Sequence, residues 1–174
     1  MKKIVIALLV LIFSTSTAFA EISQSIDKYN NISTIKSKTA VPISDKAELN
    51  VLVIKTYSTV KVGAPTVPID FLVTAPEYWF FSKTADYLVD GDPIGKRLYY
   101  TKTGHSFPQA GLVGAWAYSS LYPADPLASA IFNNKPISFR LSFLKQSSFE
   151  YKTPPDVVEE WKTVLLFTPP AAKQ

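Results

Sequence analysis

Strict alternation of apolar and polar residues in one short segment constrains the fold of this chain most. Residues 137–143 read Ile-Ser-Phe-Arg-Leu-Ser-Phe, so four apolar residues alternate with three polar ones. Successive side chains of a strand point to opposite faces, and this period of two therefore predicts a strand with one buried and one wet face.

Further segments are also typical of strands. Residues 49–57 carry apolar groups on both faces and predict a central strand. Strands are also expected at 68–74, 78–81 and 112–118. Residues 87–89 lead into Asp90-Gly91, and 97–102 follow, which predicts a hairpin because glycine tolerates a positive φ.

Two helices are expected. Asp125 caps the first, Pro126 begins it and Asn133 stops it. Thr153 is expected to cap the second, longer helix. An apolar stripe on its surface should dock on the sheet, and it consists of Val157, Trp161, Val164 and Leu165.

Strands outnumber helices, and short turns join neighbouring strands. The predicted fold is therefore mainly β (α+β), an antiparallel sheet or sandwich with one or two covering helices, the longer one C-terminal. We expect a single globular β-rich domain at residues 21–168 and a flexible tail at 169–174, where Pro169 and Pro170 occur.

The amino terminus has the pattern of a secretory signal peptide at residues 1–20. Lys2 and Lys3 precede an apolar run at 4–13, and the small residues Ala18 and Ala20 predict cleavage before Glu21. Ten residues of helix span about 15 Å, half of a bilayer core of roughly 30 Å. A permanent membrane anchor is therefore not expected, and the predicted location is the periplasm or the medium.

Composition narrows the classes of partner. The chain has 18 Lys and Arg against 14 Asp and Glu, and loss of Lys2 and Lys3 with the signal leaves a side-chain net charge of +2. Such a nearly neutral domain does not predict nucleic-acid binding. The chain has no cysteine, so the exported fold depends on its core rather than on disulfides.

The sequence predicts no catalytic residue, no metal site and no cofactor. His105 is the only histidine, and an exposed position in a loop is expected for it. Asp86, Asp90 and Asp92 supply the oxygen ligands that calcium prefers, but their spacing matches no calcium loop, and a hairpin turn explains Asp90 and Asp92.

Aromatic residues are the candidate binding residues. They concentrate where strands alternate, so every second ring should point away from one sheet face. Covering helices could bury these rings; otherwise they form an exposed surface for an envelope protein or a glycan. The candidates are Tyr78, Trp79, Tyr99, Trp116 and Tyr118.

Several short segments resemble an uncharacterised family of small exported bacterial domains. The similarity rests on Asp27-Lys28-Tyr29-Asn30-Asn31, residues 33–38, Val89-Asp90-Gly91, and the strands at 112–118 and 137–141 before a closing helix. The resemblance implies a fold over residues 26–167, and it implies no active site.

The expected function is that of an exported, non-enzymatic accessory or binding domain of the bacterial envelope. Two alternatives remain open. One is an envelope hydrolase that uses carboxylates or His105. The other is a fimbrial or surface structural subunit, which would have an incomplete sheet that accepts a donor strand.

Overall fold

A computed structural model describes residues 19–27, 32–58, 67–97, 99–107, 112–122 and 124–169, with the backbone alone at 19–20 and 96–107. The strands are β1 (Phe19–Asp27), β2 (Ile32–Ser44), β3 (Ala47–Ser58), β4 (Val67–Ala75), β5 (Phe81–Val89), β6 (Asp92–Arg97), β7 (Tyr99–Phe107), β8 (Leu112–Leu121), β9 (Ile137–Phe143) and β10 (Phe149–Lys152). The helices are α1 (Pro126–Phe132) and α2 (Pro155–Leu166). Residues 1–18, most of the predicted signal, lie outside the described residues.

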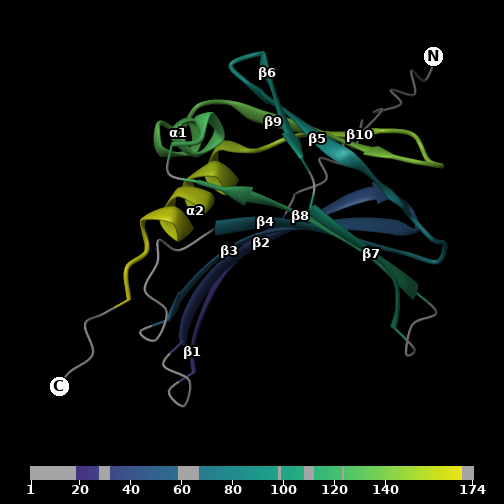
Figure 1. Cartoon of the computed structure of the whole chain (residues 1–174), viewed down its shortest axis with the longest axis horizontal. Helices are drawn as coiled ribbons and strands as arrows, with labels where there is room; N and C mark the ends of the chain where they lie inside the picture. Colours follow the sequence, from purple (N-terminus) through teal and green to yellow (C-terminus); the bar gives the residue numbers. More distant parts are fainter. Residues whose placement is uncertain are drawn as a thin grey trace, which may run out of the picture.

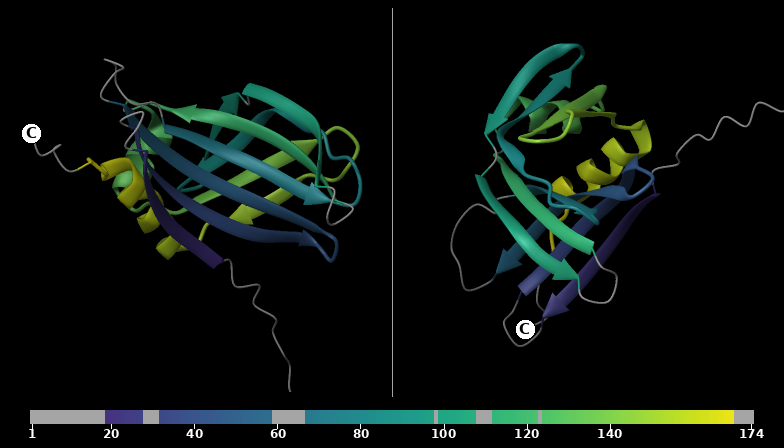
Figure 2. Two further views of the ribbon diagram at one scale, coloured as in Figure 1. Left: turned by 90° about the horizontal axis from the view of Figure 1, so that it is seen from below. Right: turned by 90° about the vertical axis from the view of Figure 1, so that its right-hand side faces the viewer.

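The strands form two antiparallel sheets. The larger has the order β1-β2-β3-β4-β8-β7, and the smaller has the order β10-β9-β5-β6. In Figure 1 the smaller sheet and both helices lie on one side of the larger sheet, whose β1 and β7 ends turn away from them; Figure 2 shows β1 at the sheet edge. The expected fold class is confirmed: mainly β, with two helices and the longer one C-terminal.

One hydrophobic core joins the two sheets and the helices. Phe71 of β4 and Phe139 of β9 place their ring centroids 5.6 Å apart across the space between the sheets. Helix α2 covers another part of the same inner face, where the Ser37 hydroxyl of β2 donates to the Glu160 carboxylate at 3.0 Å. The inner face of the larger sheet is therefore shared between the smaller sheet and α2.

The helix predictions hold except at one cap. Asp125 caps α1, and its carboxylate accepts a hydrogen bond from the Leu127 N–H at 3.0 Å. Helix α2 buries the expected stripe together with Val158, but its N-cap residue is Pro154. The prediction that Thr153 caps α2 is therefore wrong: Thr153 lies one residue too early, and its buried hydroxyl has no partner among the described residues.

Two strand predictions need correction, and two strands were missed. The hairpin partner of β5 begins at Asp92, immediately after Asp90 and Gly91, whose φ angles of 52° and 90° make the tight turn. Residues 78–80 are irregular, and β5 starts only at Phe81. Strands β1 and β2 were not predicted, since β2 buries the polar residues Ser37 and Thr39 and so shows little apolar alternation.

Candidate functional site

The outward face of the larger sheet gathers a cluster of apolar, aromatic and acidic side chains. Cross-strand pairing places Leu52, Asp70 and Tyr118 in one row. The adjacent row contains Asn50, Leu72 and Trp116. These six residues alternate with buried inner-face residues such as Val51, Ile69 and Phe71. We call them the outer-face cluster.

The two aromatic residues of the outer-face cluster form a platform. The rings of Trp116 and Tyr118 stack with centroids 5.6 Å apart and an interplanar angle of 27°. They are two residues apart in β8, and period two therefore brings both to one face. The outer-face cluster thus presents two nearly parallel rings rather than isolated aromatics.

Side chains on this face crowd one another. Asn50 is only 4% exposed although it points away from the core. Its Nδ2 donates to Glu48 Oε1 at 2.7 Å, whereas its buried Oδ1 has no partner among the described residues. Asn50 therefore holds a buried position on this face and does not present a free acceptor at the surface.

Asp70 is the acidic member of the outer-face cluster. Burial raises its pKa to about 6, and a hydrogen bond with Trp116 opposes that rise. Burial disfavours the charged carboxylate, whereas a donated indole N–H favours it. Asp70 therefore changes charge near neutral pH beside the aromatic platform.

The raised pKa of Asp70 predicts a stability change with pH. The folded state holds the proton more tightly than the unfolded state, so the free energy of unfolding should fall as pH rises from about 4 to about 6. Since the side chain is only partly buried, we expect a loss of about 1 kcal/mol. Denaturant titrations across this pH range should show that Asp70→Asn lacks this fall, whereas Asp45→Asn, on an exposed turn, retains it. Parallel profiles for Asp70→Asn and the wild type would contradict the assignment.

The five aromatic candidates fall into different places. Trp116 and Tyr118 belong to the outer-face cluster, and Tyr99 of β7 pairs with Tyr118 through the backbone. Tyr78 is 56% exposed near the start of β5, where it stacks on Phe80. The structure does not support an exposed surface role for Trp79: it is buried and packs edge-on against Phe143, with ring centroids 4.7 Å apart.

His105 lies in strand β7, where it pairs with Gly114, so its expected position in a loop is wrong. An irregular register between Thr103 and His105 interrupts the strand pairing at that point. The side chain of His105 lies outside the described part of the structure. The prediction that it could serve a hydrolase as a base stays untested.

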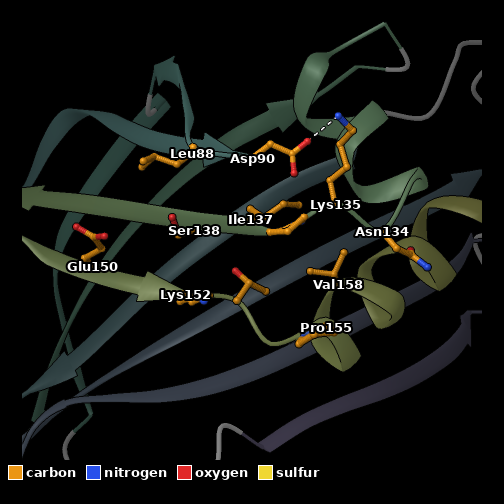
Figure 3. Close-up of a pocket in the computed structure, with 13 residues that line it drawn as sticks. Leu88, Asp90, Asn134, Lys135, Ile137, Ser138, Glu150, Lys152, Pro155 and Val158 are labelled. Carbon is orange, nitrogen blue, oxygen red and sulfur yellow. Dashed lines mark hydrogen bonds and ion pairs between the residues drawn. The ribbon is translucent and has the colours of Figure 1, made fainter.

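A separate cavity of about 720 Å³ opens at the end of the smaller sheet (Figure 3). Its lining combines Leu88, Ile137 and Val158 with polar groups from β10 and from the segment between α1 and β9. Its size suits a small organic molecule. Lys135 and Asp90 form an ion pair at 2.7 Å on its rim, drawn as the dashed line in Figure 3.

The charges around this cavity are mostly paired. Beside the ion pair of Lys135 and Asp90, Glu150 accepts from Arg140 at 2.8 Å. Lys152, which also lines the cavity, has no ion pair with the described residues. The cavity could therefore hold a small amphiphile with one negative group, but it shares no residue with the outer-face cluster.

Among the described residues, no three His, Cys, Asp or Glu side chains come together as a metal site. Asp90, at the hairpin turn, forms its ion pair with Lys135. No helix in the described ranges is long and apolar enough to cross a membrane.

Sequence comparisons assign no family to the chain. No protein-family model matches it, and no curated protein matches its sequence. Neither Asp70 nor Asn50 was predicted from the sequence as a member of the site. A signal for Asp70 was present, because it is a single acid inside the otherwise apolar segment Ile69-Asp70-Phe71-Leu72-Val73.

Proposed function

We propose that this protein is an exported binding domain of the bacterial envelope and that the outer-face cluster binds a glycan. The observation that carries the proposal is the stacked pair of Trp116 and Tyr118 beside the Asp70 carboxyl of the neighbouring strand. The signal-like residues 1–20 support export, which would bring the domain to envelope polysaccharides.

The chemistry of a sugar ring fits this combination. One face of a pyranose carries C–H groups, which pack on the electron-rich faces of aromatic rings. Its hydroxyl and acetamido groups then require hydrogen-bonding partners at the edge of the platform. Asp70, which faces Tyr118 on the neighbouring strand, is an acceptor there.

Binding is favoured over glycoside hydrolysis by the spacing of acids on the same face. Glu21 lies in the row of Asp70 but three strands away, which separates their backbones by roughly 14 Å. Glu48 lies four residues along β3 from Leu52, the partner of Asp70, or about 13 Å along the strand. Paired glycosidase carboxyl groups lie about 5–9.5 Å apart, so Asp70 would meet Glu21 or Glu48 at that distance only if both side chains extended toward each other.

The proposal is tested by isothermal titration calorimetry. Residues 21–174 are titrated with chito-oligosaccharides and with solubilised glycan strands of peptidoglycan. Trp116→Ala should weaken binding at least about tenfold, or about 1.4 kcal/mol, since it removes half of the platform. Trp116→Phe, which keeps an aromatic face, should lose less.

Tyr122→Ala is the matched control, because Tyr122 is an exposed aromatic residue outside the outer-face cluster. It should bind like the wild type. Two results would overturn the glycan proposal: no binding of either saccharide by the wild type, or equal weakening by Trp116→Ala and Tyr122→Ala when both variants are folded.

A further inference from the structure

Strand β1 is an unusually open edge of the larger sheet. The two sheets have four edge strands, β1, β7, β10 and β6. Strand β7 has two register irregularities, β10 has only four residues, and β6 contains Pro93. Strand β1 instead pairs with β2 in continuous register over nine residues. Bulges, proline and short length protect sheet edges, so β1 is the least protected of the four.

The sequence of β1 is palindromic in chemical character. Residues 21–27 read Glu-Ile-Ser-Gln-Ser-Ile-Asp, so Gln24 has the same kind of residue at equal distances on both sides. In a two-fold antiparallel pair centred on Gln24, residue 22 of one copy faces residue 26 of the other. Isoleucine then meets isoleucine and serine meets serine.

The isoleucines at this edge are exposed. Ile22 is 41% exposed and Ile26 is 57% exposed, and both lie on the inner side of the sheet together with Gln24. The last turn of α2 lies over the same row, because the Lys55 ammonium, in line with Gln24, donates to the Leu165 carbonyl. The next residue, Leu166, is 59% exposed. The edge thus carries an apolar strip on a strand that has a described neighbour, β2, on one side alone.

We infer that β1 pairs with β1 of a second copy of this chain, in antiparallel register about Gln24, and so forms a two-fold dimer with a continuous twelve-stranded sheet. The pairing satisfies the open backbone edge and packs Ile22 of each copy against Ile26 of the other. The inference goes beyond the proposed glycan binding and does not depend on it.

The ends of this pairing bring acids together, and the α-ammonium group that cleavage would create lies beside them. Glu21 of one copy faces Asp27 of the other, which is unfavourable for two carboxylates. Cleavage before Glu21 would add an α-ammonium group at the same position. That cation offsets the repulsion between the two carboxylates. The cleaved chain should therefore dimerise more tightly than a chain that keeps residues before Glu21.

The dimer is tested with residues 21–174, which contain the whole hydrophobic core, by sedimentation equilibrium. The wild type should be a dimer, and Ile22→Lys combined with Ile26→Lys should be a monomer, because lysine would face lysine at both pairs. Ile22→Lys combined with Ile26→Glu should restore the dimer, since each lysine then faces a glutamate, and added salt should weaken it. Leu144→Lys, at an exposed apolar residue away from β1, is the control and should remain dimeric.

A crosslinking experiment tests the register independently. The chain has no cysteine, so Gln24→Cys introduces a single thiol at the two-fold axis. Facing residues of an antiparallel pair have Cα atoms about 4.5–5.5 Å apart, within disulfide range. Gln24→Cys should form a disulfide-linked dimer in air, and Leu144→Cys should not. A monomeric wild type at every concentration, or a dimer that survives the double lysine substitution in a folded protein, would overturn the inference.

Discussion

Replacing Phe139 with alanine is expected to lower the free energy of unfolding by about 3–5 kcal/mol. Phe139 is fully buried on β9, and its ring packs against Phe71 of the larger sheet. It also contacts Tyr87 and Tyr151 of its own sheet, with centroid distances of 6.2 and 5.2 Å. Truncation therefore removes contacts on both sides of the interface between the sheets and leaves a cavity.

Urea unfolding measures this loss. A domain of this size has a total stability of about 5–15 kcal/mol, so Phe139→Ala should remove a large fraction of it. Phe139→Leu, which keeps much of the volume, should lose less. Leu144→Ala is the surface control, because Leu144 is 71% exposed, and it should change stability by less than about 0.5 kcal/mol. A loss below about 1 kcal/mol for Phe139→Ala would show that the ring does not join the sheets.

Replacing Trp161 with alanine should be comparably severe, with a loss of about 3–5 kcal/mol. Trp161 is fully buried in the stripe by which α2 docks on the larger sheet. Alanine is the best helix former, so the substitution does not weaken α2 itself. The expected loss therefore reports docking of the helix rather than its propensity to form.

Trp161→Phe separates ring volume from hydrogen bonding. The Trp161 indole N–H has no partner among the described residues, so phenylalanine should lose only part of the packing. Glu159→Ala, on the exposed side of the same helix, is the matched control and should stay within about 0.5 kcal/mol of the wild type. In thermal and urea unfolding, the loss of stability should be largest for Trp161→Ala, smaller for Trp161→Phe and smallest for Glu159→Ala. Equal losses for Trp161→Phe and Trp161→Ala would instead point to an unrecognised role of the N–H group.

Substitutions that break the dimer and substitutions that break the glycan site should have different effects on binding. Substitutions at Ile22 and Ile26 lie at the sheet edge, whereas Trp116 lies on β8, beyond β2, β3 and β4 in the sheet order. The dimer variants should therefore keep the affinity of a single site for a short oligosaccharide. They should lose only the gain that two linked sites have on a long glycan strand.

Much of the fold follows from local chemistry. The alternation at residues 137–143 predicts β9, and Asp125 followed by Pro126 predicts the start of α1, because these signals act within a few residues. The Asp90-Gly91 turn was predicted for the same reason, but its partner strand was misplaced. That strand includes Pro93, and its position at the sheet edge makes the proline tolerable.

The candidate site was predicted only in part. Local alternation indicates that Trp116 and Tyr118 share a face, and the structure shows that they do. It gave no means of separating them from Trp79, whose burial depends on the distant Phe143. Asp70 joins the aromatic pair only because β4 and β8 are neighbours, although 36 residues separate the end of β4 from the start of β8.

Short-range periodicity and capping are enough to predict the β-rich class, both helices and the alternation that turns Trp116 and Tyr118 to one face. Which face of each strand is covered depends instead on how distant elements pack. The smaller sheet and α2 share the inner face of the larger sheet, so Phe139 and Trp161 lie in the core, whereas Asp70 and Trp116 lie on the opposite side. Strand order is a property of long-range packing, and it alone brought Asp70 beside the aromatic platform and left β1 at an open edge.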